Sequence, residues 1–114
     1  MLQKLVARLR NGVLSTDPII RMGGEEFLIL LNDCNADGAR ATAKRLARII
    51  GDAPFRLMDN EIAVTVSFGI ATPFATDTSY KNALMRSDTA LYAAKNAGRN
   101  RVFEFDTDGT KEAT

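Results

Sequence analysis

The residues with the clearest chemical potential form the stretch "RMGGEEF", Arg21 to Phe27. Adjacent glycines let a ligand approach the backbone closely and leave N–H groups free to face phosphate or ribose oxygens. A carboxylate beside them can hold Mg²⁺, which prefers hard oxygen ligands and usually shares itself with substrate phosphates. The alternative is an ordinary glycine turn followed by two solvated acids, Glu25 and Glu26. In a regular strand these two side chains point to opposite faces, so both cannot face one ligand.

A second stretch, "AAKNAGRNR" from Ala93 to Arg101, places Lys95 and Arg99 four residues apart with Gly98 between them. A point-charge lysine beside a forked arginine suits a polyphosphate. The alternative is a cationic helix end that complements the helix dipole. Taken alone, the two residues leave both interpretations open.

The composition narrows the chemistry further. The 114 residues include a single cysteine, Cys34, which excludes an intrachain disulfide. They include no histidine, which argues against histidine-dependent triads and zinc sites. General acid–base chemistry must therefore come from carboxylates, lysines or a metal-bound water. The 15 basic and 14 acidic residues nearly cancel, so no global field favours nucleic acid or a membrane. No apolar run approaches the ~20 residues of a membrane span, and the length predicts one domain.

The hydrophobic spacing predicts the elements that must position these residues. Helices are expected from Leu2 to about Gly12, from about Asp37 to Gly51, and from Ser79 to about Ala97, with Gly98 as a stop. Strands are expected in "IIRM" and "EFLILL", joined across Gly23 and Gly24, then in "FRLM", "EIAVTVSFGIA" and "RVFEF". This order indicates an α+β fold with an antiparallel sheet. Residues 1–105 would form the domain and residues 106–114 a flexible tail.

Three separated motifs, "RMGGEEF", "VTVSFGIA" and "SDTALYAAKNAGRNRV", resemble in order and spacing the GGDEF family of bacterial diguanylate cyclases, whose signature has a GGEEF variant. The resemblance implies the GGDEF or nucleotide-cyclase palm-like fold. It also implies condensation of two GTP into cyclic di-GMP with release of two pyrophosphates, Mg²⁺ or Mn²⁺ as cofactor, and a homodimer. A bacterial cytoplasmic location, an upstream sensor domain in the parent protein and no nucleic-acid polymer as partner belong to the same expectation.

The resemblance assigns roles to the residues of the first motif. Gly23 and Gly24 would form the hairpin tip against GTP. Glu25 would be the catalytic carboxylate that also binds metal. Glu26 would be the second signature acid, supporting the loop or the chemistry.

Other family positions map outside that motif. Lys95 and Arg99 match residues that hold the GTP phosphates. Asp17 and Arg45 match possible product-inhibition contacts. Leu14, however, occupies the position where the family's inhibition motif has an arginine, so primary feedback inhibition is not expected.

The chain also departs from the family pattern. The resemblance covers the C-terminal two-thirds or so of the domain, because the family's N-terminal strand and helix, with a metal-binding Asp and residues that read the nucleotide, have no counterpart. The resemblance therefore predicts a diguanylate cyclase domain that is inactive as this chain stands. The alternatives are a degenerate remnant that senses nucleotide or binds a protein partner, and a structural fragment without a function of its own.

The absent strand leads to an expectation about assembly. In the family sheet it lies between the signature hairpin and the strand from Val64 to Ala71. Without it, Phe27–Leu31 and Val64–Ile70 would keep unpaired apolar edges, which are prone to pair with another chain. We expect an intertwined homodimer or direct pairing between those two strands.

Overall fold

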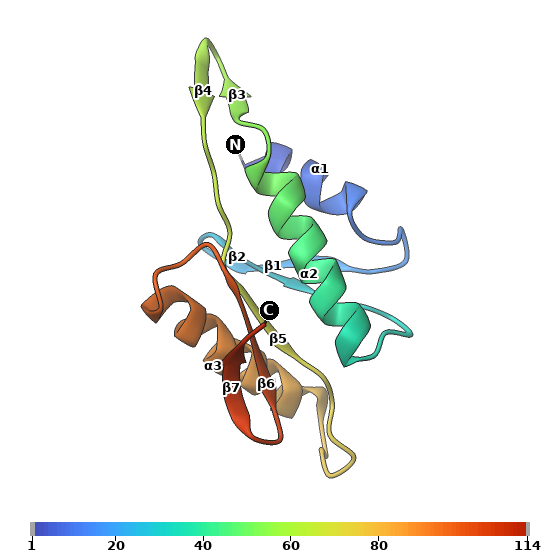
Figure 1. Ribbon diagram of the computed structural model, residues 1–114. Coiled ribbons are helices and arrows are strands. Elements are labelled where there is room, and N and C mark those ends of the chain that lie inside the picture. Colours follow the sequence, from blue (N-terminus) through green and yellow to red (C-terminus); the bar gives the residue numbers. More distant parts are fainter. Residues whose placement is uncertain (1, 114) are drawn as a thin grey trace.

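A computed structural model describes residues 2–113, which form three helices and seven strands (Figure 1). The helices are α1 (Leu2–Asn11), α2 (Ala36–Gly51) and α3 (Tyr80–Asn96). The strands are β1 (Ile19–Gly23), β2 (Glu26–Ile29), β3 (Phe55–Leu57), β4 (Asn60–Ile62), β5 (Phe68–Ala71), β6 (Val102–Asp106) and β7 (Gly109–Glu112). Within residues 2–113, no helix is both long enough and apolar enough to cross a bilayer.

Helices α2 and α3 begin at side-chain caps. The Asn35 Oδ1 accepts a hydrogen bond from the Gly38 N–H at 2.8 Å, and the Ser79 Oγ accepts one from the Lys81 N–H at 3.2 Å. Such caps satisfy N–H groups of the first turn that have no partner within the helix. The predicted cap at Ser79 is confirmed, as is the predicted end of α2 at Gly51.

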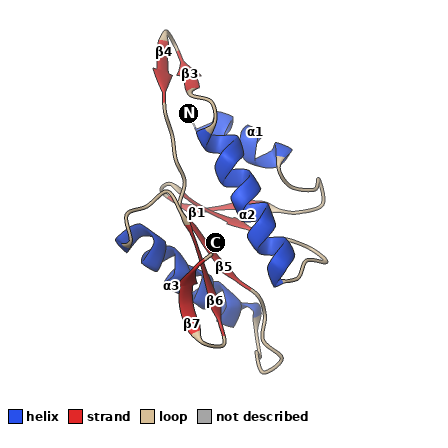
Figure 2. Ribbon diagram, viewed as in Figure 1, coloured by secondary structure: helices blue, strands red, loops and turns tan. Residues whose placement is uncertain are grey.

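The strands form three separate sheets (Figure 2). The pairs β1–β2 and β3–β4 are antiparallel hairpins. In the third sheet, β6 lies between β5 and β7, parallel to the former and antiparallel to the latter. A parallel pair needs a crossover connection, which α3 supplies between β5 and β6. The α+β prediction is confirmed, but the third sheet is mixed rather than antiparallel throughout.

The predicted long strand "EIAVTVSFGIA" is divided in the structure. Residues 63–67 form no strand. Among the described residues, β4 pairs with β3 and β5 pairs with β6, and no strand pairs with the segment between β4 and β5. The predicted direct pairing of Phe27–Leu31 with Val64–Ile70 is likewise wrong, since β2 pairs with β1 and β5 pairs with β6. A strand requires a neighbouring edge, and apolar alternation alone does not supply one.

The structure also differs from the prediction at the C-terminal end. Instead of continuing as a tail, the chain turns after Asp106 and returns as β7, antiparallel to β6. The Asp106 Oδ1 accepts a hydrogen bond from the Asp108 N–H at 2.8 Å, and Gly109 has φ +101°. Both are ordinary turn features, which the sequence contains in "DTDG". Residue 114 lies outside the described residues.

The main core lies beneath α1 and α2. The core combines side chains from both helices with side chains from segments far apart in the sequence. The buried cluster consists of Leu9, Leu46, Ile50 and Phe55. The half-buried side chains packed around it are Leu5, Val13, Ile19, Ile29, Val64, Val66 and Phe68. The side chains at 64, 66 and 68 thus face the core as their alternation predicted, even though residues 63–67 form no strand.

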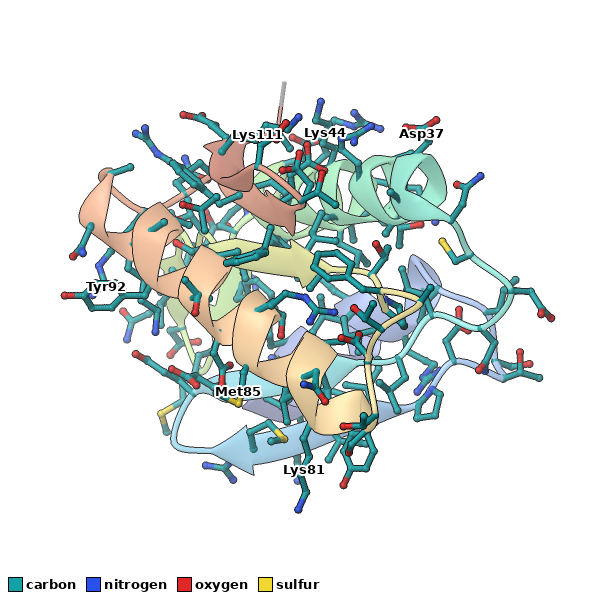
Figure 3. All side chains as sticks on the ribbon, turned by 90° about the horizontal axis from the view of Figure 1, so that it is seen from below. Asp37, Lys44, Lys81, Met85, Tyr92 and Lys111 are labelled. Carbon is teal, nitrogen blue, oxygen red and sulfur yellow. The ribbon has the colours of Figure 1, made fainter. Side chains whose placement is uncertain are left out.

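Helix α3 covers the third sheet with its small side chains. Ala90 and Ala94 have no exposed area, and Leu91 is half-buried beside them. On the outer side of the helix, Met85 and Tyr92 point into solvent (Figure 3). The inner face therefore permits the helix to approach the sheet closely, which fixes the position of its C-terminal end.

An ion pair connects α2 to the third sheet. Arg40 Nη2 lies 2.9 Å from Glu104 Oε2, and the Glu104 side chain is buried. Hydrogen bonds to Glu104 and Asp37 raise the pKa of Arg40 above its ordinary value. Removing one member of a buried pair leaves an uncompensated charge, so this contact holds β6 beneath α2.

Candidate functional site

The tip of the β1–β2 hairpin is an open glycine turn. Strand β1 ends at Gly23 and β2 begins at Glu26, so Gly24 and Glu25 make the turn. Gly23 has φ +138° and Gly24 has φ +55°, conformations that favour glycine. No atom lies within 4 Å of a Cβ built on either glycine. The predicted hairpin is confirmed, and its backbone has room for a ligand.

Arg21 braces this turn, a role that the sequence analysis did not assign. Its Nε and Nη2 donate hydrogen bonds to the Gly24 carbonyl oxygen at 3.1 and 2.8 Å. Because the peptide unit is planar and trans, fixing this carbonyl directs the Glu25 N–H to the opposite side. The signal in the sequence was a forked donor placed three residues before a turn carbonyl.

The two signature acids have different environments. The Glu26 Oε2 accepts a hydrogen bond from Lys95 Nζ at 3.0 Å, across a separation of 69 residues. Glu25 lies in the turn with its side chain exposed, and the hydrogen bonds of residues 2–113 include none to its carboxylate. The structure therefore brings Glu26 to α3 and leaves Glu25 facing solvent.

The end of α3 is a closed backbone motif that fixes Arg99 relative to Lys95. The Arg99 N–H donates to the Ala94 carbonyl at 3.0 Å and the Gly98 N–H to the Lys95 carbonyl at 3.4 Å. This is the Schellman arrangement, with Gly98 at φ +121° in the position that requires a left-handed residue. The predicted stop at Gly98 is confirmed.

The loop after α3 then runs beside the hairpin tip (Figure 1). Arg99 and Asn100 have φ +64° and +50°, which is unusual for two consecutive residues other than glycine. The Asn100 N–H donates to Ser67 Oγ at 3.1 Å, which ties the loop to the segment before β5. Strain of this kind concentrates at functional sites, where surrounding contacts maintain it.

The hairpin tip offers few donors for a metal ion. Among the described residues, no group of three or more Asp, Glu or Cys side chains is placed to hold a metal ion. Glu25 alone supplies one carboxylate, whereas Mg²⁺ in nucleotide sites takes one or two carboxylates and completes its shell with phosphates and water. The described residues at the tip therefore supply only part of a metal shell, which a bound phosphate would have to complete.

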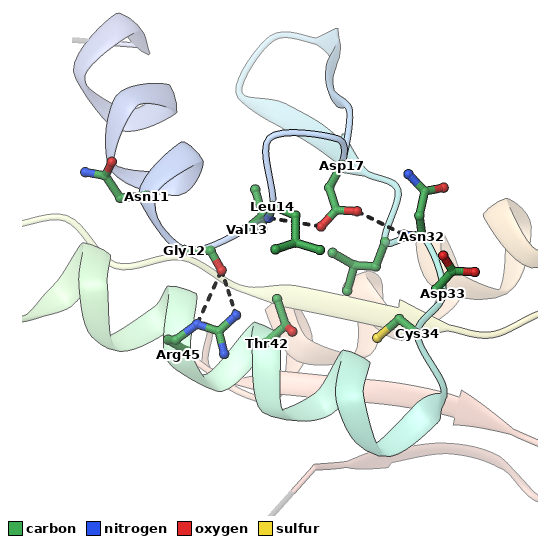
Figure 4. Close-up of a pocket in the computed structure, with 11 residues that line it drawn as sticks. Asn11, Gly12, Val13, Leu14, Asp17, Asn32, Asp33, Cys34, Thr42 and Arg45 are labelled. Carbon is green, nitrogen blue, oxygen red and sulfur yellow. Dashed lines mark hydrogen bonds between the residues drawn. The ribbon is translucent and has the colours of Figure 1, made fainter.

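The two possible product-inhibition residues line a different cleft, of about 430 Å³ (Figure 4). The Asp17 carboxylate is buried and accepts hydrogen bonds from the Leu14 N–H at 3.1 Å and the Asn32 N–H at 3.0 Å. Arg45 donates to the Gly12 carbonyl at 2.7 Å from Nη2. Both side chains thus already stabilise loops of the fold. Nothing at the hairpin tip lines this cleft.

Comparison with known proteins assigns this chain and its fold to one family. The family model described as "Diguanylate cyclase, GGDEF domain" matches residues 1–101. Diguanylate cyclase A of Treponema denticola is 32% identical over 102 residues, which is 90% of this chain and 28% of that protein. The chain belongs to the GGDEF family. It spans less than a third of the length of the curated relatives that it matches.

Two solved structures support the same assignment. The active GGEEF domain of a diguanylate cyclase from Vibrio cholerae has a TM-score of 0.81 and 27% identity, covering 93% of this chain and 67% of that one. The GGDEF domain of DgcB from Caulobacter crescentus, solved in complex with c-di-GMP, has a TM-score of 0.79 and 26% identity, covering 88% of this chain and 60% of that one. The predicted family and palm-like fold are confirmed.

Proposed function

We propose that the hairpin tip and the end of α3 form the nucleotide site of a diguanylate cyclase domain, which joins two GTP into cyclic di-GMP and releases two pyrophosphates. The observation that carries the proposal is the contact between Glu26 of the GGEEF turn and Lys95 of α3, 3.0 Å apart. This contact brings the strand that follows the glycine turn to the end of α3, and the proposed site adds Glu25 from the turn and Arg99 from the loop after α3.

Each residue has a role in that reaction. The open backbone at Gly23 and Gly24 admits the phosphate chain, and Lys95 and Arg99 neutralise its charge. The 3′-hydroxyl of one GTP attacks the α-phosphorus of the other, pyrophosphate leaves, and Glu25 would accept the hydroxyl proton. A divalent ion, Mg²⁺ or Mn²⁺, would arrive with the triphosphate and supply charge neutralisation. One site holds one GTP, so the reaction needs two copies facing each other in a homodimer.

The first test asks whether the 114-residue chain by itself makes cyclic di-GMP. We expect no cyclic di-GMP from the 114-residue chain with GTP and Mg²⁺, because the family's metal-binding Asp and nucleotide-reading residues have no counterpart in its sequence. Chromatography of the products is the measurement. Steady product formation that disappears in Glu25→Ala would contradict this expectation. Adding the N-terminal strand and helix of the family domain should give activity.

Nucleotide binding tests the site independently of turnover. Lys95 and Arg99 should bind a triphosphate weakly, and calorimetry should find similar affinities for GTP and ATP. A clear preference for GTP would mean that a base-reading contact exists elsewhere in the chain. Loss of binding in Lys95→Met and Arg99→Met would place the phosphates as proposed.

A second candidate function is nucleotide sensing or protein interaction without catalysis. The observation in its favour is that no cluster of three or more acidic or cysteine side chains among the described residues is placed to hold a metal ion. Binding of cyclic di-GMP at the cleft of Asp17 and Arg45 would support this function. We expect that binding to be weak, because both carboxylate oxygens of Asp17 already accept hydrogen bonds.

Assembly and location complete the proposal. The outer edges of β2 and of residues 63–67 carry no strand partner within residues 2–113, so a second copy that pairs there would cover them. Light scattering and hydrogen exchange test this homodimer, and a monomer with rapidly exchanging edges would contradict it. We also propose a cytoplasmic location and an upstream sensor domain in the parent protein.

A further inference from the structure

We propose that the Lys95–Glu26 ion pair is exchanged when a triphosphate binds: Lys95 moves to the phosphates, and the Glu26 carboxylate is released into the site at that moment. The inference rests on the proposed function, because it assumes that phosphates bind at the end of α3. In this proposal Glu26 acts by holding the Lys95 ammonium group until a phosphate binds. Glu25, by contrast, is the proposed acceptor of the hydroxyl proton.

The pair is suited to exchange because it is partly open to solvent. The side chains of Lys95 and Glu26 are 29% and 48% exposed, at a separation of 3.0 Å. Ion pairs with this exposure are weak, since water screens them and both side chains lose rotational freedom. A triphosphate brings several negative charges and many acceptor oxygens, so it outcompetes a single carboxylate for the ammonium group.

The backbone around the pair is fixed, so the exchange is confined to side chains. Lys95 follows the fully buried Ala94, and the Schellman turn holds the backbone on its other side. Glu26 is the first residue of β2 and is held by the hairpin ladder. The four-carbon stem of Lys95 allows its ammonium group to turn away without displacement of α3.

Because of the exchange, the carboxylates of Glu25 and Glu26 would become available at different stages of nucleotide binding. The Glu25 carboxylate is exposed and outside the ion pairs of the described residues, so its charge is available before any ligand binds. The charge of Glu26 is compensated by Lys95 until phosphate takes that cation. The second acid therefore becomes available in the site only when the nucleotide is bound.

Calorimetry with inorganic tripolyphosphate, in EDTA and at low salt, tests this exchange on the full chain. Glu26→Gln should bind about two- to fivefold more tightly than the wild type, because Lys95 no longer has to leave a partner. Glu25→Gln is the matched control, since it removes the same charge one residue away without touching Lys95. It should change the affinity by clearly less.

A double-mutant cycle completes the test. Lys95→Met should weaken binding, and in that background Glu26→Gln should lose its specific gain over Glu25→Gln. In the wild type, NMR should show that tripolyphosphate shifts the Glu26 carboxyl carbon more than that of Glu25. Unchanged unfolding midpoints for the Glu26 and Glu25 variants would exclude misfolding.

The outcomes separate the two proposals. Equal tightening by Glu25→Gln and Glu26→Gln, or no tightening by Glu26→Gln, would overturn the exchange while leaving the phosphate site intact. Absence of tripolyphosphate binding in every variant, at concentrations up to the millimolar range, would overturn the phosphate site itself and the exchange with it.

Discussion

Glycine has opposite structural roles at Gly69 in β5 and at the pair Gly23–Gly24 at the hairpin tip. A Cβ on Gly69 would lie 2.2 Å from the Ser87 carbonyl oxygen and 2.3 Å from the Leu91 nitrogen, both backbone atoms of α3. A Cβ on either tip glycine would meet nothing within 4 Å. The first glycine lets a helix and a strand touch, and the tip glycines shape an open turn.

This difference shows that the two sides of the proposed site are held in place by different kinds of contact. Close packing of α3 on β5 gives Lys95 and Arg99 a rigid base. The tip is held by polar side-chain contacts, namely the Arg21 fork and the Lys95–Glu26 pair. One side of the site is therefore fixed by packing, and the other is held by contacts that a ligand can replace.

The largest effect is expected at Gly69. Gly69→Ala should lower the free energy of unfolding by about 3 kcal/mol, because the new methyl group would overlap helix backbone that cannot rotate away. Urea denaturation is the measurement. Gly51→Ala is the control, since nothing lies within 4 Å of a Cβ there, and it should leave stability unchanged or slightly raised. A loss at Gly69 no larger than at Gly51 would contradict the close contact.

A smaller loss is expected at the open tip. Gly24→Ala should cost about 1–2 kcal/mol, because φ +55° is disfavoured for a residue with a Cβ even where space is free. Asn tolerates this conformation, so Gly24→Asn should cost less. Equal losses for Ala and Asn would mean that something other than backbone conformation matters at Gly24. Thermal unfolding of the three proteins makes the comparison.

Removing the Arg21 fork should have a still smaller effect on stability. Arg21→Lys should cost less than about 1 kcal/mol, because it weakens hydrogen bonds exposed to solvent. Amide exchange at Glu25 should nevertheless accelerate, since the turn peptide loses its brace. Arg56→Lys is the matched control: Arg56 pairs with the Glu61 side chain on the other hairpin and contacts no turn carbonyl. Similar exchange at Glu25 in both variants would refute the bracing role.

The last prediction concerns acid pH and the loop before α3. Hydrogen bonds from Arg86, and next from the Phe74 N–H, hold the pKa of Asp77 below its ordinary value. A depressed pKa in the folded state stabilises the fold above about pH 4, the usual range of the unfolded carboxyl, and this contribution disappears as the pH falls through the folded pKa. The stability difference between wild type and Asp77→Asn should therefore be largest at neutral pH and narrow below about pH 4. Urea midpoints across this range would show it, and a gap that stays constant would contradict it.

Local rules were sufficient for much of the fold. Ser79 as a cap, Gly98 as a stop and the hairpin across Gly23 and Gly24 depend on backbone chemistry within a few residues, and all three were predicted correctly. The turn that leads into β7 had a comparable signal in "DTDG", but that signal was interpreted as part of a tail.

The family assignment also came from the sequence, because its motifs are defined by residue type and spacing. The candidate site residues came from the same source, and their roles remain predictions. By contrast, the alternation from Ile62 to Ile70 did not predict where β4 ends, because a strand also needs a partner edge.

What the sequence determined by itself was therefore the set of local elements and the residues that could bind a nucleotide. Only the tertiary structure decided that β5 runs parallel to β6, that Arg40 meets Glu104, and that Lys95 meets Glu26. These contacts join residues 34, 64 and 69 positions apart. Their formation depends on how whole helices pack on strands, and spacing along the chain does not encode that geometry.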